Sequence, residues 1–414
     1  MEAMRLPLNG NPVPDIQTSL PEPLPSPPPI ICFSHLRWDF VIQRPQHLMR
    51  RFAREQQVFV FEEPVASEQT YASLEYCPFP DDNVIVLRPR LPEAWDDTAR
   101  TEALRGLLEM HLAVQGGGRP VLWFYTPMMF GFARHVDAAA VVYDCMDELS
   151  AFLYAPTELK QLEADLLRRA DVVFTGGYSL FEAKKACHDN IHPFPSSVEL
   201  GHFQRARTGD LPSPSDQAGI PHPRLGFYGV LDERLDFGLV RQIAAARPEW
   251  HFVMIGPIAK IDWSDLPQAP NIHYLGPKAY CDLPAYLAGW DVALMPFAIN
   301  EATRFISPTK TPEYLAAGRP VVSTPITDVV RQYGGLAGVA IGGTAAEFVT
   351  CCEAMLALRK TPDHWRPGAD AVLASCSWDD TFKRMRKLID AAACRFEVRP
   401  ESTLTLATPV PMEL

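Results

Sequence analysis

Residues 303–324 read TRFISPTKTPEYLAAGRPVVST, and this pattern predicts a polar loop, a short helix and a buried strand. Ser307 and Thr311 each precede a proline, so each can cap a helix that begins at that proline. Gly318 provides a stop at the C-terminal end of the helix, and Pro320 introduces the apolar run of the strand. The stretch therefore predicts one loop–helix–strand unit of an α/β protein.

The loop brings polar and cationic side chains to the start of the predicted helix, namely Arg304, Ser307, Thr309 and Lys310. Free backbone N–H groups, the positive end of the helix dipole and two cations favour a phosphate or diphosphate there. Glu313 follows one turn after Thr309, and its carboxylate would repel a phosphate unless it binds another part of the ligand. A ribose fits, because its two adjacent hydroxyls can both donate to one carboxylate. An ordinary connection with a solvated lysine and arginine is the alternative.

This order of residues resembles the nucleotide-sugar site of GT-B glycosyltransferases, in which a serine–proline pair, a lysine and a Glu-Tyr-Leu-Ala-Ala-Gly helix precede a Pro-Val-Val strand. The resemblance implies that Glu313 holds the donor ribose and that Lys310 and its loop hold the diphosphate. Retaining members usually carry a second glutamate eight residues earlier, where this chain has Phe305. The stereochemical outcome is therefore open.

Neighbouring segments extend the resemblance over about residues 224–335. The run LGFYGVLDERLD from Leu225 resembles the opening strand and turn of the donor domain. Gly229 would let the backbone approach a phosphate, and Arg234 would help to neutralise it, although a plain turn with an exposed arginine is equally compatible. In the family, a later loop lies beside the nucleobase, which implies backbone bonds and stacking by Lys278 and Tyr280.

The composition is that of a large globular protein rather than of a membrane or nucleic-acid-binding protein. A chain of 414 residues is too long for one core, and its hydrophobic (47%) and charged (21%) fractions are ordinary. Residues 1–29 contain nine prolines and no apolar core, which predicts a disordered leader without a signal peptide. Nine cysteines without a Cys-x-x-Cys pair indicate reduced thiols in the cytoplasm, and the net charge of −12 argues against nucleic-acid partners.

Alternating strands and helices predict an α/β fold with two doubly wound parallel sheets. We expect an acceptor-side Rossmann-like domain over 30–207, a linker over 208–223 and a nucleotide-sugar-binding domain over 224–377. The resemblance to GT-B enzymes adds a C-terminal helix, 378–395, that crosses back to the first domain, followed by a loose tail, 396–414. The cleft between the two domains is the expected site. The predicted strands are 30–33, 58–61, 84–87, 121–125, 141–143 and 171–174 in the first domain, and 225–228, 252–255, 272–275, 292–295 and 321–323 in the second.

The loop after the first strand gathers an aromatic residue and several hydrogen-bonding side chains, which suit a sugar. It resembles a bacterial branch of GT-B enzymes that build surface polysaccharides, marked by Gln-Arg-Pro-Gln after the first strand. We expect acceptor contacts from Arg37, Trp38, Asp39 and Arg44, with capping and surface ion pairs as the alternative.

Carboxylates close the strand 141–143 and are placed for proton transfer. An inverting transferase needs a base for the acceptor hydroxyl, and our order of candidates is Asp144, then Asp147, then His35. The alternative for Asp144 is a cap on the following turn. No Asp-x-Asp motif occurs in a typical metal-binding context, and GT-B enzymes generally need no bound metal, so no cofactor is expected.

The resulting hypothesis is a cytoplasmic glycosyltransferase that uses a nucleotide-diphosphate sugar, with uridine preferred, and a saccharide or lipid-linked acceptor in surface polysaccharide assembly. A dinucleotide oxidoreductase is disfavoured, because no Gly-x-Gly-x-x-Gly opens a helix after the first strand. A nucleotide-sugar epimerase and a catalytically degenerate scaffold protein remain alternatives. Arg50, Arg51 and Arg54 on the predicted helix 46–54 could give a weak peripheral contact with the inner face of the cell membrane, although a core-facing helix is the better interpretation.

Overall fold

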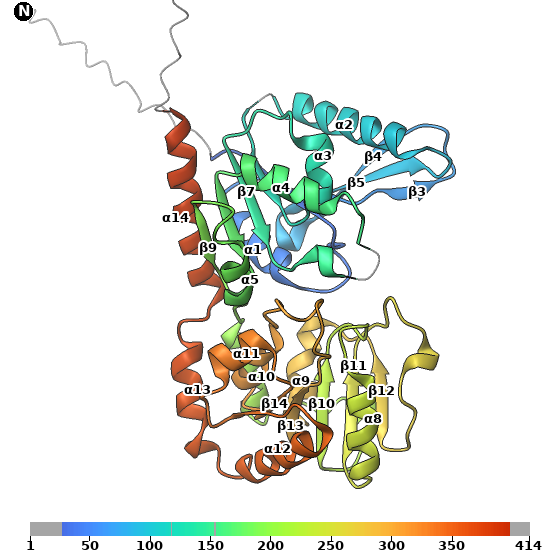
Figure 1. The fold of residues 1–414 in the computed structure, drawn as a ribbon, viewed down its shortest axis with the longest axis vertical. Helices are drawn as coiled ribbons and strands as arrows, with labels where there is room; N and C mark the ends of the chain where they lie inside the picture. The colour runs from blue at the N-terminus through green and yellow to red at the C-terminus, as the bar shows by residue number, and fades with distance from the viewer. Residues whose placement is uncertain (1–26, 117, 153–154, 398–414) are drawn as a thin grey trace, which may run out of the picture.

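The structure is a computed structural model that describes residues 27–116, 118–152 and 155–397, with side chains of the last helix described to Ala393. Two sheets, each flanked by helices, lie one above the other (Figure 1). Residues 1–26 of the predicted leader and 398–414 of the predicted tail lie outside the described residues, and the first two residues of the predicted tail belong to the last helix.

The first sheet has nine strands in the order β3-β5-β2-β1-β6-β7-β8-β9, with β4 antiparallel to β5 and every other pairing parallel. Strands β3, β4 and β9 are absent from the sequence-based prediction, because they are short or lie at a sheet edge with partly exposed side chains. The strands are β1 (Ile30–Ser34), β2 (Val58–Glu62), β3 (Val65–Ser67), β4 (Ser73–Phe79), β5 (Val84–Pro92), β6 (Val121–Phe124), β7 (Ala140–Cys145), β8 (Val172–Thr175) and β9 (Ile191–Pro193).

Side chains on alternate positions of these buried strands form two separate cores. Phe33 packs in a cluster with residues of α2 (Asp97–Val114), α3 (Phe130–Ala133) and α4 (Leu159–Arg169). Its neighbour Cys32 points to the other face, where α1 (Arg44–Phe52) and α14 (Trp378–Glu397) lie. The near-continuous apolar runs of the central strands are thus explained by burial on both faces.

The second sheet is parallel throughout and has the order β12-β11-β10-β13-β14-β15. Strand β15 is the one strand of this sheet that the sequence pattern did not predict. The strands are β10 (Arg224–Tyr228), β11 (His251–Ile255), β12 (Ile272–Gly276), β13 (Val292–Met295), β14 (Val321–Ser323) and β15 (Val339–Ile341), and the helices are α8 (Phe237–Ala246), α9 (Leu283–Ala288), α10 (Lys310–Ala316), α11 (Thr327–Tyr333), α12 (Ala345–Leu358) and α13 (Arg366–Leu373).

The chain enters the core of the second domain before the predicted linker begins. Val198, Phe203 of α6 (Leu200–Gln204) and Ala206 are buried in that core. Within the predicted linker 208–223, the short helix α7 (Ser215–Ala218) is anchored by Gln217, whose side-chain amide donates to Tyr286 O at 3.0 Å. We therefore propose that the division between the domains falls near residue 196.

Helix α10 begins at Lys310, and not at Pro308 or Pro312. Thr309 is its N-cap residue, already has helical angles (φ −61°, ψ −26°), and accepts no capping hydrogen bond on its side chain. The expectation that Ser307 or Thr311 caps this helix is therefore wrong. A proline in the first turn is tolerated, because its missing N–H would have no partner within the helix.

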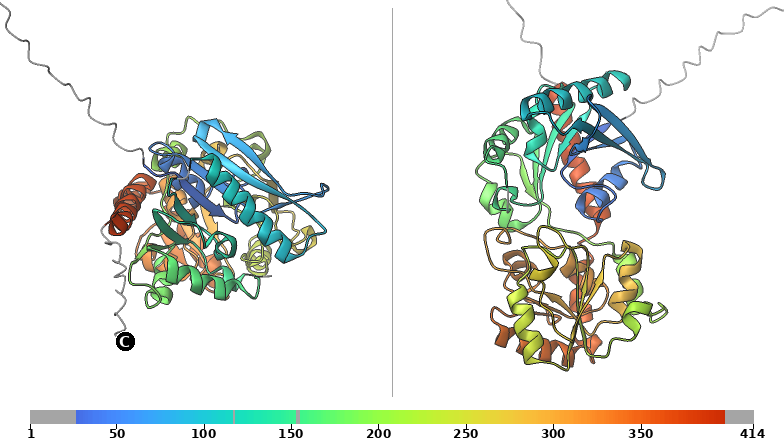
Figure 2. Two further views of the ribbon diagram at one scale, coloured as in Figure 1. Left: turned by 90° about the horizontal axis from the view of Figure 1, so that it is seen from above. Right: turned by 90° about the vertical axis from the view of Figure 1, so that its right-hand side faces the viewer.

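Helix α14 packs against α1, β7 and β8 of the first domain (Figures 1 and 2). Its buried residues include Met385 and Ile389, which belong to the core on that face of the first sheet. An ion pair between Arg51 Nε and Asp379 Oδ1, 2.8 Å apart, connects the start of α14 to α1.

The apolar side chains of α1 face this core as well. Leu48, Met49 and Phe52 are at most 1% exposed. Because these three side chains are buried, α1 presents no open apolar face to a membrane. Arg50 pairs with Asp82 at 2.6 Å. None of the helices in the described part of the chain combines the length and the apolar character needed to cross a membrane.

Candidate active site

A cavity of about 440 Å³ lies between the two domains, where loops follow the carboxyl ends of strands. The first domain contributes residues 40–44 after β1, Met146 and Asp147 after β7, and Gly176 after β8. The second domain contributes Tyr228–Val230 after β10, residues 255–257 after β11, residues 277–280 after β12, and the stretch Ile306–Lys310 with Glu313. The two halves of the chain therefore share one site.

The backbone at Gly229 passes directly under the side chain of Lys310. Gly229 has φ +145°, a conformation that favours glycine, and an added Cβ would lie 2.3 Å from Lys310 Cε. Lys310 Nζ lies 5.8 Å from the centre of the Phe227 ring. Within the described residues Lys310 forms no salt bridge, so its ammonium group is available to an anionic ligand.

Glu313 lies one turn further along α10 and lines the same cavity. Its side chain is 5% exposed, and Oε2 accepts a short hydrogen bond from the Tyr228 hydroxyl. Burial raises the pKa of this carboxyl, while Tyr228 and Lys310 act in the opposite direction. No hydrogen bond from a described residue reaches Glu313 Oε1, so this oxygen can accept a ligand hydroxyl.

Tyr280 and Lys278 line the cavity but are engaged by protein groups. The Tyr280 ring stacks on His202 with centroids 4.5 Å apart, and its buried hydroxyl has no hydrogen-bond partner among the described residues. The Lys278 ammonium pairs with Asp216 at 2.7 Å, so this lysine can offer its backbone rather than its charge to a ligand.

Asp147 is the carboxylate that the first domain presents to the cavity. Burial raises its pKa to about 6, and among the nearby charges Arg234, Arg44 and Lys310 oppose this rise. A carboxylate with a pKa near neutrality suits proton transfer at physiological pH. Asp147 and the cations Lys310 and Arg234 thus line the same cavity from opposite domains.

Asp144, the first-ranked base candidate, is fully buried and does not line the cavity. Both of its oxygens accept hydrogen bonds from Arg44 Nε, at 3.0 and 2.9 Å. Arg44 itself lines the cavity, and its Nη1 donates to Phe194 O at 2.7 Å. The geometry is that of a structural ion pair that supports the cavity wall from behind.

The other first-domain candidates surround the site without lining it. Arg37 Nη1 pairs with Glu62 at 3.0 Å, Trp38 Nε1 donates to Asp82 at 2.9 Å, and Asp39 pairs with Arg88 at 3.3 Å. The ion pairs of Arg37 and Asp39 fit the alternative of surface ion pairs. Together with the Trp38 hydrogen bond they hold the segment Phe40–Gln43, which does line the cavity.

His35 and Arg304 are also outside the lining of the cavity. The Nδ1 atom of His35 is buried without a hydrogen-bond partner in the described structure, and burial, aided by Lys260, lowers the pKa of this imidazole to about 4. Arg304 is 62% exposed and pairs with Glu301 at 3.5 Å. Of the predicted diphosphate cations, Lys310 and Arg234 line the cavity and Arg304 does not.

Two contacts join the domains near the loop that precedes α10 and at the start of α11. The Ser196 hydroxyl donates to Ser307 O at 2.7 Å, and the Ser179 N–H donates to Asp328 Oδ1 at 2.9 Å. Phe305 packs against the core of the first domain. The position where retaining relatives of the GT-B type usually carry a glutamate is thus occupied by an apolar contact between the domains.

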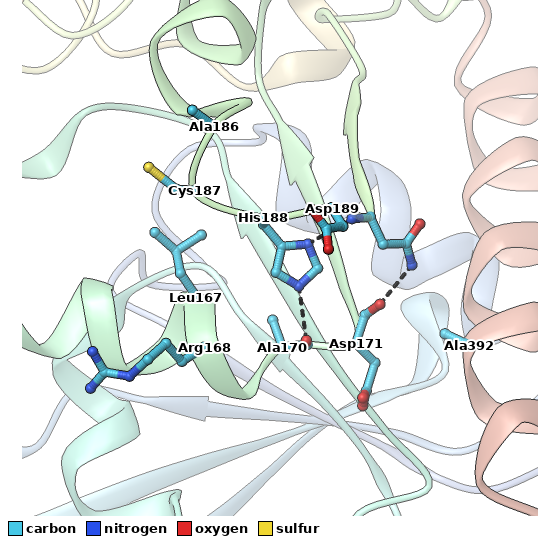
Figure 3. A pocket seen from close by; sticks show the side chains of 10 residues that line it. Leu167, Arg168, Ala170, Asp171, Ala186, Cys187, His188, Asp189 and Ala392 are labelled. Atoms are coloured by element: carbon cyan, nitrogen blue, oxygen red, sulfur yellow. Dashed lines mark hydrogen bonds between the residues drawn. The ribbon is translucent and has the colours of Figure 1, made fainter.

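A second cavity of about 440 Å³ lies on the outer face of the first domain, near Ala392 of α14 (Figure 3). His188 Nε2 lies 3.0 Å from Ala170 O, and the Asn190 amide donates to Asp171 O at 2.6 Å. His188 and Asn190 therefore hold the local backbone, and Arg168 pairs with Asp165, which does not line this cavity.

Sequence reasoning missed Tyr228, Ser196 and the apolar wall Phe40–Ile42. Tyr228 could have been found, because it ends a strand immediately before the predicted phosphate glycine. Ser196 carries no sequence signal, since its partner Ser307 is brought close only by domain packing. Phe40–Ile42 are apolar and gave no sign of a binding role, whereas the more polar residues beside them did.

Two facing Rossmann-like domains with a shared cavity define the GT-B fold, and solved structures agree. The chain resembles Alr3699/HepE of Anabaena, determined with UDP and glucose, at a TM-score of 0.64 and 12% identity over 87% of this chain and 99% of that one. It also resembles a sucrose-phosphate synthase of Thermosynechococcus elongatus at a TM-score of 0.63 and 12% identity, over 89% of this chain and 100% of that one.

Sequence comparisons add the class of enzyme. Residues 222–357 match the model of the family Glycosyl transferases group 1. A protein of Bacillus subtilis (strain 168), which carries the name teichuronic acid biosynthesis glycosyltransferase TuaH, is 26% identical over 298 residues, or 68% of this chain and 70% of that protein. The chain is a glycosyltransferase with the GT-B fold.

Proposed function

We propose that this enzyme transfers a sugar from a nucleotide-diphosphate donor, with uridine as nucleoside, to a saccharide or lipid-linked acceptor during surface polysaccharide assembly in the cytoplasm. The observation that carries the proposal is the meeting of Lys310, Gly229 and Glu313 at the start of α10, opposite Asp147. The name of the Bacillus subtilis relative, a glycosyltransferase of teichuronic acid biosynthesis, supports a role in polysaccharide biosynthesis. The UDP and glucose bound in HepE support a UDP-sugar donor.

In the proposed binding mode, the donor diphosphate lies between Lys310, Arg234 and the backbone at Gly229. The ribose hydroxyls donate to Glu313, and the nucleobase lies against the backbone of residues 277–280. Bringing the phosphates next to these groups places the sugar toward the first domain. A donor that displaces water from this cavity strengthens the interaction of the cations with the departing diphosphate.

We propose Asp147 as the base that takes the proton of the acceptor hydroxyl, in an inverting reaction. It is the carboxylate that the described part of the first domain presents to the cavity, whereas Asp144 is occupied by Arg44. The absence of a glutamate at position 305 agrees with this choice. The anomeric configuration of the product, observed by NMR, tests it directly.

A thermal-shift screen of nucleoside diphosphates and their sugars tests the donor assignment. A ligand at a hundred times its dissociation constant adds about 2.7 kcal/mol to the stability of the folded protein. We expect UDP and at least one UDP-sugar to raise the melting temperature. Binding of a UDP-sugar without transfer to a panel of saccharide acceptors would instead indicate a scaffold protein, and conversion of the sugar without an acceptor would indicate an epimerase.

Replacing Glu313 with alanine should weaken UDP and uridine binding by a similar factor, because the lost hydrogen bonds lie on the ribose that both ligands carry. Hydrogen bonds to a charged group contribute about 1.5–3 kcal/mol, so the loss should be roughly ten- to a hundredfold. Isothermal titration calorimetry measures both affinities. Unchanged affinity in a folded variant would refute the ribose assignment.

Replacing Lys310 with glutamine should weaken UDP binding by roughly ten- to a hundredfold and leave uridine binding nearly unchanged, because a charge-assisted contact of about 1.5–3 kcal/mol to the diphosphate is lost. Arg304→Gln is the matched control, since Arg304 belongs to the same loop but points to solvent. We expect less than a twofold effect from it. Equal losses for UDP and uridine in Lys310→Gln would show that this lysine only shapes the loop.

A further inference from the structure

Asp232 lies in the loop between β10 and α8 and directs both of its carboxylate oxygens to a single arginine. Oδ1 accepts from the backbone N–H of Arg234 at 3.1 Å and from its Nε at 3.0 Å. Oδ2 accepts from Nε at 3.1 Å and from Nη2 at 2.6 Å. Asp232 is 5% exposed, so this carboxylate is held below the cavity surface rather than solvated.

Arg234 is also approached from the first domain. Its guanidinium carbon lies 5.9 Å from the centre of the Phe152 ring, and Lys260 Nζ lies 5.1 Å from the same ring. The guanidinium thus lies where the two domains meet, among the residues that line the cavity. Its Nη1 atom has no contact with Asp232, so one edge of the planar group remains for a ligand.

We propose that Asp232 is a positioning residue that holds the Arg234 guanidinium in the orientation that receives the donor diphosphate; this inference rests on the proposed function. An unrestrained arginine side chain has several rotatable bonds, and its immobilisation on binding would cost affinity. Three hydrogen bonds from the guanidinium to one buried carboxylate remove that freedom before the donor arrives. The remaining Nη1 edge is then left for a ligand in the cavity that Arg234 lines together with Gly229 and Asp147.

The charge of Asp232 and its geometry have opposite effects on affinity. A carboxylate close to a diphosphate repels it, so a residue that only added charge would weaken binding. If Asp232 orients Arg234, removing the carboxylate lowers the affinity for the diphosphate. The loss of a fixed guanidinium then outweighs the loss of charge repulsion. Asp232→Asn separates these effects, because the amide has nearly the same size but accepts at only one atom.

The affinities of UDP and uridine are measured by calorimetry for the wild type, Asp232→Asn, Arg234→Gln and the double variant. We expect Asp232→Asn to weaken UDP binding about three- to tenfold, as for the ordering of one long side chain, and to leave uridine binding unchanged. In the Arg234→Gln background the second substitution should have no such effect. Asp236→Asn is the matched control, because Asp236 is in the same loop but caps α8 through Leu239 N at 2.7 Å.

Tighter or unchanged UDP binding in Asp232→Asn overturns the proposal. An equal loss of UDP and uridine affinity in this variant also overturns it, as does a loss of UDP affinity when Asp232→Asn is added to Arg234→Gln. A second measurement needs no ligand: the Nε–Hε resonance of Arg234, assigned by its loss in Arg234→Gln, should be protected from exchange in the wild type and lose this protection in Asp232→Asn. Equal protection in both proteins also overturns the positioning role. A wild type that binds no nucleoside diphosphate overturns the proposed function, and the resonance then decides the role of Asp232 by itself.

Discussion

Replacing Arg44 with methionine is expected to lower the free energy of unfolding by about 3–5 kcal/mol, the usual cost of leaving one member of a buried ion pair without its partner. Arg44 is 3% exposed and Asp144 is fully buried, with Arg44 Nη2 only 2.8 Å from Oδ1. Urea denaturation of the two proteins measures the difference. The double variant Arg44→Met, Asp144→Leu should recover most of the loss, because no charge is then left in the core.

The expected loss depends on pH in a definite direction. Burial raises the pKa of Asp144 and Arg44 opposes the rise, so without Arg44 the folded-state pKa lies further above the unfolded-state value. The carboxyl can then stay protonated in the folded variant at low pH, and stability falls as the pH rises from about 4 through the raised folded-state pKa. We expect a larger difference from the wild type at pH 8 than at pH 5.

Arg105→Met is the control, because Arg105 and Glu109 form a solvent-exposed pair on α2 at 3.3 Å. Such pairs contribute about 0–1 kcal/mol. A loss below 1 kcal/mol for Arg44→Met, or the same loss at both pH values, would contradict the role of this pair in the first domain.

Replacing Asp147 with asparagine is expected to lower kcat by roughly a hundred- to ten-thousandfold, the range for loss of a general base. UDP affinity should not fall, since the substitution removes a negative charge from the surroundings of the diphosphate. The rate of the wild type should decrease as the pH falls below about 6, because burial raises the pKa of Asp147 to about that value and the base works only when deprotonated. Initial rates with the UDP-sugar found by thermal shift measure both effects.

Asp137→Asn provides a matched carboxylate control, since Asp137 lies 77% exposed on the same domain, away from the cavity. Its kcat should stay within twofold of the wild type. An Asp147→Asn enzyme with near-normal kcat would show that another group accepts the proton, and a product with retained configuration would assign that role to the leaving diphosphate.

The predicted order of strands and helices and the second-domain part of the site followed from local patterns. The stretch 303–324 carries the lysine, the glutamate and the helix that presents them within a few consecutive residues, so their spacing is visible without a tertiary structure. The apolar strands of both sheets are visible for the same reason, because burial on two faces requires an uninterrupted run of apolar residues. Edge strands such as β4 lack that run, since one side of them is exposed.

The first-domain part of the site could not be predicted in the same way. Asp144 and Asp147 are three residues apart and equally suited to act as a base, yet one meets Arg44, a hundred residues away in the chain, and the other faces the cavity. The side chains of Arg37, Trp38 and Asp39 suited a sugar ligand, but they contact protein side chains on β2, on β5 and in the short segment after β4. A side chain's partner depends on which distant segment packs beside it.

The sequence by itself determined the class of fold, the helix that carries Lys310 and Glu313, and the glycine at position 229. Each of these depends on periodicity, backbone conformation or spacing within one short segment. Only the tertiary structure decided that Asp147 faces the cavity, that Asp144 supports it from behind, and that Asp232 holds Arg234 from below. These assignments depend on burial and on contacts between segments far apart in the chain. Burial and nearby charges together determine the pKa of a carboxyl group. The same amino-acid type therefore has different roles at positions that the sequence pattern cannot distinguish.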